Sequence, residues 1–138
     1  MTGVPLEGRQ VSELKQPIDT TPAAFMERAL ELSRIAVDRG DGSEYGAVIV
    51  KEDRIIGEGW NRVEVNNDPT AHGEVEAIRD AARRLQTRDL SGCVIYTTHG
   101  HPCPMCTAAC YWAGLDRIYY GSEPGEIVDG GAPMYERC

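Results

Sequence analysis

Two short segments hold the residues that most constrain the fold of this chain. One is His72-Gly73-Glu74, and the other is Pro102-Cys103-Pro104-Met105-Cys106. One imidazole and two thiolates are ligands that zinc commonly takes in proteins. A single ion can bind all three only if the fold brings the two segments together in space.

Three protein ligands leave one position of a tetrahedral zinc open, which separates catalytic zinc sites from structural ones. A water molecule in that position has its pKa lowered towards about 7, so hydroxide becomes available at neutral pH. Glu74 is not needed as a ligand and lies where a proton shuttle for this water is required. The pattern resembles the H-x-E and P-C-x-x-C signature of zinc-dependent nucleobase deaminases, and it predicts hydrolytic deamination.

Two other interpretations of the cysteine pair stay open. A Cys-x-x-Cys pair can be a redox centre, although such a centre has no use for the upstream histidine and glutamate. A structural zinc site would need a fourth protein ligand. The candidates for that ligand are His99, His101, Cys93, Cys110 and Cys138.

Length and charge limit the function classes. A chain of 138 residues is one domain that can bury a core without disulfides. The net charge of −8 makes nucleic acid an improbable partner, since phosphate contacts need clustered lysines and arginines. We interpret the densest basic group, Arg83, Arg84 and Arg88, as a solvated helix face.

Cysteine usage and hydropathy indicate the compartment. The chain has five cysteines, an odd number that favours a reducing environment over a disulfide framework. No window holds the roughly 18 apolar residues of a membrane span, and the N-terminus lacks a secretion signal. We therefore expect a cytoplasmic protein without a membrane partner.

Hydrophobic periodicity predicts one α/β domain over residues 22–138, preceded by a loose polar arm over residues 1–21. We expect a three-layer α/β/α fold with a central mixed sheet of four or five strands, because a helix joins the last two predicted strands and makes them parallel. The predicted helices cover residues 22–38, 68–85 and 104–113, and the predicted strands cover residues 46–50, 54–58, 93–96 and 117–120.

Two predicted helices begin at the proposed ligands. His72 and Glu74 fall in the first turns of a helix that Asp68 is expected to cap, and Cys103 and Cys106 lie at the start of the next. Both helix N-termini then face the metal, and their dipoles favour thiolate over thiol. The residues of the first helix expected to face the core are Val75, Ile78, Ala82 and Leu85.

Between residues 25 and 122 the chain resembles the cytidine deaminase-like superfamily. The resemblance is carried by residues 45–50, 56–61, 67–72 and 102–106. It implies a homodimeric, zinc-dependent hydrolase that acts on C–N bonds in cyclic amidines and releases ammonia. The implied roles are binding of one Zn²⁺ by His72, Cys103 and Cys106, proton transfer by Glu74, and substrate binding by Asn61, Ala71 and Pro102.

Only a few residues indicate which branch of this superfamily the chain resembles. Residues 59–62 and 68–72 resemble tRNA adenosine deaminases, but the basic surface those enzymes need is missing. Residues 103–106 and 111–113 resemble guanine deaminases, whereas Gly73 resembles fungal cytosine deaminases. We therefore expect a small-molecule substrate, a free nucleobase or related aminated heterocycle, with guanine first. A tRNA adenosine deaminase and a non-catalytic, zinc-stabilised protein are the alternatives.

Two departures from the family pattern concern the pocket. Residues 98–102 replace a shorter Thr-x-Glu-Pro approach to the first cysteine, so His99 and His101 either line the pocket or face solvent. The chain also ends soon after residue 120, which predicts a pocket that is open or completed by a partner subunit. Asp129 is a candidate to bind an exocyclic amine.

Overall fold

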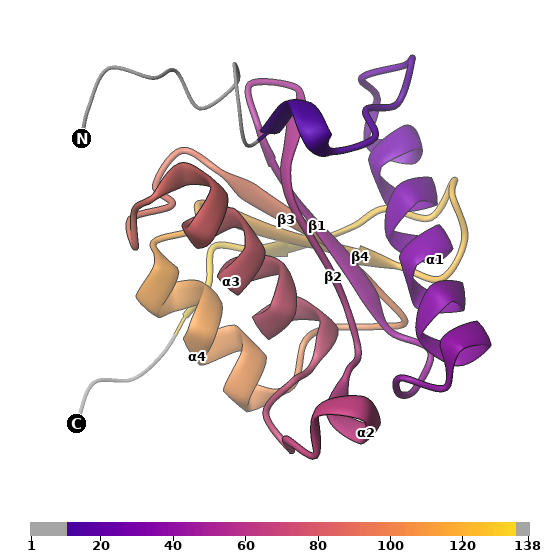
Figure 1. Ribbon diagram of the computed structural model, residues 1–138. Helices are drawn as coiled ribbons and strands as arrows, with labels where there is room; N and C mark the ends of the chain where they lie inside the picture. Colours follow the sequence, from indigo (N-terminus) through magenta and orange to yellow (C-terminus); the bar gives the residue numbers. More distant parts are fainter. Residues whose placement is uncertain (1–10, 135–138) are drawn as a thin grey trace.

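The computed structural model describes residues 11–134 and contains a five-stranded mixed sheet in the order β2-β1-β3-β4-β5 (Figure 1). Only β3 and β4 pair in parallel, as predicted, and the other neighbours are antiparallel. No described helix has the length and apolar character needed to cross a membrane. The elements in chain order are η1 (Val11–Glu13), α1 (Pro22–Arg39), β1 (Gly46–Lys51), β2 (Arg54–Trp60), α2 (Val63–Asn66), α3 (Gly73–Leu85), β3 (Val94–Thr98), α4 (Pro104–Ala113), β4 (Arg117–Gly121) and β5 (Val128–Gly131).

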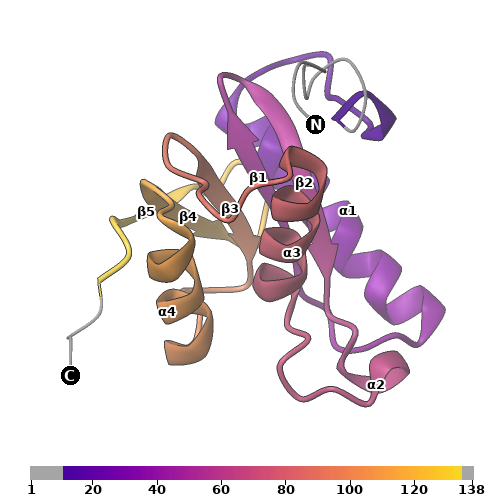
Figure 2. The same ribbon diagram turned by 60° about the vertical axis from the view of Figure 1, so that its left-hand side comes forward.

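Helices cover both faces of the sheet, which confirms the three-layer prediction (Figures 1 and 2). Alternate residues of a strand point to opposite faces, so the central strand β1 contributes to two cores. Ala47 and Ile49 pack in the core under α3 and α4, while Val48 and Val50 pack in the core under α1. All four side chains are buried, as expected for the middle of a covered sheet.

Helix α1 has clear signals at both ends. The Thr21 hydroxyl accepts a hydrogen bond from the Ala24 N–H at 3.2 Å, and Pro22 occupies the first turn. Gly40 ends the helix in the left-handed conformation with φ of 71°. These local signals explain why the predicted and observed bounds of this helix agree to within one residue.

Helix α3 lies unusually close to β2. A Cβ at Gly57 would lie 2.5 Å from the Ala81 Cβ, and one at Gly59 would lie 2.3 Å from the Ala77 backbone nitrogen. Small residues on both elements are therefore required. The predicted inward face of the helix is right for Leu85, which is buried, and for Ile78, which packs against the core, but wrong for Val75 and Ala82. The face that meets these glycines carries Gly73, Glu74, Ala77, Ala81 and Leu85.

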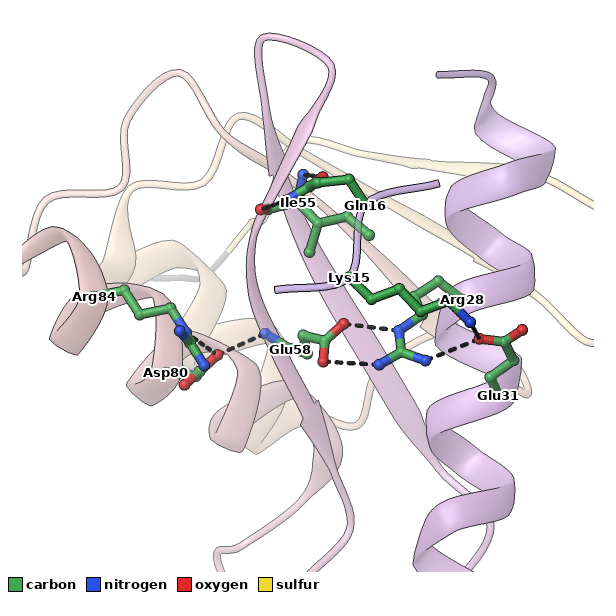
Figure 3. Close-up of polar contacts among 8 residues, drawn as sticks. All are labelled: Lys15, Gln16, Arg28, Glu31, Ile55, Glu58, Asp80 and Arg84. Atoms are coloured by element: carbon green, nitrogen blue, oxygen red, sulfur yellow. Dashed lines mark hydrogen bonds and ion pairs between the residues drawn. The ribbon is translucent and has the colours of Figure 1, made fainter. Parts of the chain in front are cut away.

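The exposed edge of the sheet at β2 is closed by side chains from three directions (Figure 3). The Gln16 side chain donates to the Ile55 carbonyl at 2.8 Å and accepts from the Ile55 N–H at 2.9 Å, as a neighbouring strand would. Asp80 of α3 accepts from the Glu58 N–H at 3.0 Å. Unpaired strand edges promote association, so this closure protects the monomer fold.

The same edge carries a paired arginine. The Glu58 carboxylate accepts from Arg28 Nε at 2.8 Å and from its Nη2 at 3.1 Å, which ties β2 to α1 (Figure 3). This pairing is the main reason that the pKa of Arg28 is raised above its ordinary value. Glu31, one turn along α1, accepts a further bond from Arg28 at 2.9 Å.

The predicted loose arm is wrong for residues 11–16, while residues 18–21 are exposed and residues 1–10 lie outside the described part. Val11 is fully buried in the core under α3, and Leu14 is 8% exposed in the core under α1. With Gln16, this segment wraps the edge of β2. Because the segment is mostly polar, its sequence did not indicate that Val11 and Leu14 are buried.

Three further features differ from the predictions: the start of α3 and the presence of α2 and β5. Asp68 does not cap α3, because its carboxylate binds the Thr70 N–H and hydroxyl at 2.9 and 2.7 Å and the helix begins only at Gly73. Helix α2 was missed, since its short Val-Glu-Val-Asn sequence has no helical period and the Asp41 carbonyl holds it from a distance. Strand β5, with two glycines and one aspartate, carries little strand propensity.

We expect Gly59→Ala to destabilise the protein, because the new methyl group meets backbone atoms of α3 that cannot move independently. The free energy of unfolding should fall by about 1–3 kcal/mol. Urea denaturation measures this. Gly125→Ala is the matched control, since a Cβ there meets nothing within 4 Å. Equal stability of the two variants would contradict the close packing of α3 on β2.

Candidate active site

Two helix N-termini bring the proposed metal ligands together. His72 is the N-cap of α3 with φ −69° and ψ 157°, and Cys103 is the N-cap of α4 with φ −64° and ψ 167°. Neither side chain makes the hydrogen bond that an N-cap residue ordinarily donates or accepts. Both side chains are instead turned towards each other and towards Cys106 in the first turn of α4.

The spacing of these three residues fits zinc. His72 Nδ1 lies 3.7 Å from Cys103 Sγ and 3.5 Å from Cys106 Sγ. Tetrahedral zinc with ordinary Zn–N and Zn–S bond lengths places its nitrogen and sulfur ligands about 3.6 Å apart. All three ligand atoms lie within 4.8 Å of one another, so His72, Cys103 and Cys106 are positioned to form a metal site.

None of the proposed fourth protein ligands joins this cluster among residues 11–134; Cys138 lies outside that range. Cys110 is fully buried one turn further along α4, where burial and then the Glu74 charge raise the pKa of its thiol to about 12. Its sulfur is not among the ligand atoms that lie within reach of one ion. Three ligands and an open fourth position are the arrangement of a catalytic site.

Cys106 shows what the metal must supply. Burial, followed by the nearby Glu74 carboxylate, raises the pKa of the Cys106 thiol far above its ordinary value. A divalent cation supplies the missing positive charge, and the residues present therefore fit zinc chemically as well as geometrically.

Glu74 lies beside the ligands without being one of them. Its side chain is 6% exposed, and Oε1 lies 3.6 Å from Cys106 Sγ. It reaches the floor of a pocket of about 450 Å³ that His72 and Cys103 also line. No lysine or arginine is among the described residues that line it. The lining residues are Ser43, Tyr45, Asn61, Val63, Glu64, Pro69, His72, Glu74, Thr98, His99, Gly100, His101, Pro102 and Cys103.

Comparison with known families decides what this arrangement is. Residues 19–122 match the model of the cytidine and deoxycytidylate deaminase zinc-binding region. The chain belongs to this deaminase family. The match includes both metal-binding segments and Glu74, and it confirms the resemblance seen in the sequence.

Individual relatives narrow the comparison. Guanine deaminase from Bacillus subtilis is 45% identical over 78% of this chain and 68% of its own length. Its crystal structure superimposes with a TM-score of 0.67 at 47% identity, covering 72% of this chain and 62% of that one. The tRNA-specific adenosine deaminase of Aquifex aeolicus is 40% identical over 71% of this chain and 64% of its own. NE0047, solved in complex with 2,6-diaminopurine, is 31% identical with a TM-score of 0.70 over 86% of this chain and 65% of that one.

Asn61 is held in place from both sides in this deaminase pocket. Its Oδ1 accepts the Val63 N–H at 3.0 Å and so starts α2, while its backbone N–H donates to the Tyr45 carbonyl at 2.9 Å. A Cβ at Gly42 would lie 2.0 Å from this Oδ1, so only glycine fits there. Because the oxygen is already bonded, the Nδ2 amide is the group that remains to donate to a substrate.

Of the other three residues predicted to bind substrate, one lines the pocket and two do not. Pro102 lines the pocket, and its carbonyl accepts bonds from His101 Nδ1 at 3.0 Å and from the Thr107 hydroxyl at 3.2 Å. Ala71 is fully buried and not part of the lining. Asp129 lies on β5, bonded to Arg117 at 3.0 Å and to the Gly131 N–H at 2.8 Å, and it is also outside the lining.

His99 and His101 both line the pocket and are also exposed to solvent, so the structure combines the two positions left open by the sequence. Sequence reasoning missed Tyr45, Glu64 and Gly42 at this site. Tyr45 belongs to residues 45–50, which resemble the family, so this resemblance could have identified it as a site residue. Nothing local marked Gly42, because its contact with Asn61 joins residues far apart in the chain.

We expect Glu74→Gln to retain stoichiometric zinc, whereas Cys106→Ser should lose most of it. The first change leaves all three ligand atoms in place, and the second removes a thiolate. Metal analysis after exhaustive dialysis measures both. Loss of zinc from Glu74→Gln would make Glu74 a ligand and contradict its separate role.

Proposed function

We propose that this protein is a zinc-dependent hydrolase that removes the exocyclic amine of a free nucleobase, with guanine as the first candidate. One observation carries the proposal. A three-ligand metal site and a buried carboxylate, Glu74, face the same pocket.

The reaction adds water to the amino-bearing ring carbon and releases ammonia, leaving a carbonyl. Zinc bound by His72, Cys103 and Cys106 would act as a Lewis acid that lowers the pKa of a water molecule. Glu74 then takes one proton from the attacking water on its carboxylate and gives it to a ring nitrogen. It next takes the proton of the hydroxyl group on the tetrahedral ring carbon and gives it to the amine, so that ammonia leaves as the carbonyl forms. A buried carboxylate suits this task because it keeps the proton from exchanging with solvent.

The lining supports a substrate without phosphate. Glu64 and Glu74 line the pocket, and no described lysine or arginine does, so a phosphate group would meet repulsion there. The Asn61 amide is available to donate to a ring carbonyl or ring nitrogen. The likeness to the Bacillus subtilis guanine deaminase, and to NE0047 with its bound 2,6-diaminopurine, favours a purine.

The arginines support a small substrate over RNA. Arg79 pairs with Glu76 at 2.7 Å, Arg83 pairs with Asp80, and Arg84 pairs with Asp80 and with Glu13. Paired guanidinium groups make weak phosphate sites, since the anion must displace a carboxylate. Two of the three arginines that the sequence singled out as basic, Arg83 and Arg84, are therefore already paired with carboxylates. With five cysteines in the chain, a reducing cytoplasmic location is also part of this proposal.

Ammonia release from zinc-loaded protein tests the function directly. The panel is guanine, cytosine, adenine, their nucleosides, aminated pterins and triazines, and a tRNA substrate. We expect guanine to be turned over, and Glu74→Gln to lower the turnover by about 10²–10⁴-fold at unchanged zinc content. Turnover of tRNA alone would establish the adenosine deaminase alternative. Silence of the whole panel would establish a non-catalytic zinc protein.

We also infer that the protein forms a homodimer through α4. None of the ten residues of this helix is charged, unlike every other helix within residues 11–134. Trp112 is 73% exposed on it, with Met105 and Ala108 on the same face at helical spacing. Two copies that each carry a charge of −8 repel least where no charge is present, so a second copy is the occupant that suits this face.

We expect Trp112→Glu to produce monomers, because the new carboxylates would face one another across the interface. Sedimentation velocity at micromolar concentration measures the state. Ile18→Glu is the matched control, since Ile18 is also fully exposed but lies in the segment before α1. A monomeric wild type, or a dimeric Trp112→Glu variant, would refute the α4 interface.

A further inference from the structure

His99 adopts a backbone conformation that no local structure explains. Non-glycine residues with positive φ are uncommon and are worth explaining individually. Those of residues 11–134 are Glu52, Asp53, Asn67, Gln86 and His99, with φ between 50° and 65°.

Four of these residues have ordinary reasons. Glu52 and Asp53 form the two-residue turn between paired Lys51 and Arg54, a type of hairpin that requires positive φ at both positions. Asn67 and Gln86 are the C-caps of α2 and α3. His99, with φ of 65°, follows strand β3 and belongs to neither class.

The chain holds His99 in this conformation from several sides. Its N–H donates to the Gly121 carbonyl at the end of β4 at 2.9 Å. Gly100 follows with φ of 103°, so two successive residues have positive φ. Backbone conformations of this kind persist where the surroundings fix them, and they cluster at functional sites.

The His99 side chain is directed to the pocket rather than into the core. Its ring meets the Tyr45 ring edge to face, with centroids 5.9 Å apart and planes at 80°. Its Nε2 lies 3.6 Å from Glu44 Oε2 at the rim. His99 and Tyr45 both line the pocket that contains Glu74.

His101 is anchored differently. Its ring packs edge to face on Tyr120 with centroids 5.5 Å apart, and its Nδ1–H is used by the Pro102 carbonyl. The two histidines of this loop therefore contact different residues. Only His99 is paired with a second aromatic ring of the lining.

We propose that His99 is a substrate-binding residue that forms, with Tyr45, an aromatic wall against which the flat ring of the substrate packs. The inference rests on the proposed deamination of a planar heterocycle. Aromatic side chains contribute substantially to the binding of bases because every base has a π-face. Glycine would adopt this left-handed backbone with less strain than histidine. The role in substrate binding therefore explains why an aromatic residue occupies the position.

The test uses the fact that glycine suits the backbone at position 99 but has no aromatic ring. His99→Gly suits the positive φ, so the melting temperature should stay unchanged or rise slightly. The KM for guanine should rise by about tenfold, with kcat changed by less than about twofold, because a stacking surface is lost and Glu74 is untouched. His99→Asn, which tolerates the same backbone but has no aromatic ring, should behave like the glycine variant. His99→Phe, which keeps a ring, should restore KM to within about threefold of the wild type.

Gln86→Gly is the matched control. Gln86 has φ of 54° but caps α3 on the surface, away from the pocket lining. It should show the same thermal behaviour as His99→Gly with no change in KM.

Three outcomes separate this inference from the proposed function. Unchanged KM in both ringless variants, with an active wild type, overturns the role of His99 and leaves the deaminase proposal standing. A raised KM accompanied by lost zinc or a lowered melting temperature makes His99 structural and also overturns its role. A zinc-loaded wild type that releases ammonia from no base overturns both.

Discussion

The close contact between α3 and β2 fixes the helix that carries His72 and Glu74 at its N-terminus. Gly57 and Gly59 leave no room for a side chain, and they let Ala77 and Ala81 lie directly on the strand. Interiors packed at this density transmit small displacements instead of absorbing them. The N-terminus of α3, with His72 and Glu74, is thus set by a contact one or more turns away from the metal site.

A second constraint is electrical. The site gathers two cysteines and the Glu74 carboxylate at a position where Glu74 and Cys106 are almost fully buried. Such a group of potential anions is costly in a protein interior unless a cation joins it. The same zinc that would activate water therefore also stabilises the arrangement that binds it. Folding, metal binding and catalysis are coupled at these few side chains.

Several charged side chains outside the metal site form ion pairs with one another, whereas α4 carries no charge and no lysine or arginine lies among the described residues that line the pocket. Arg28 of α1 and Arg84 of α3 are bonded to carboxylates, and the edge strand β2 is closed by Gln16 and Asp80 (Figure 3). This leaves α4 as a charge-free surface and the pocket without cationic residues. A small neutral substrate and a second copy of the chain are the ligands that suit those two surfaces.

The sequence by itself determined the layers of the fold, the zinc ligands and the separate role proposed for Glu74, because these depend on local periodicity and on the chemistry of a few residue types. Helix α1 was located closely since its cap, proline and terminal glycine act within a turn of the chain. Only the tertiary structure decided the start of α3, the existence of α2 and the packing of residues 11–16 against β2. The start of α3 differs from the other two, because Asp68 accepts its bonds from nearby Thr70 and does not cap the helix. The other two depend on a hydrogen bond or close contact between residues distant in sequence, and local propensity carries no information about such a partner. The same reason holds for the pocket: Gly42 accommodates Asn61, and Tyr45 meets His99, only because the folded sheet brings their segments together.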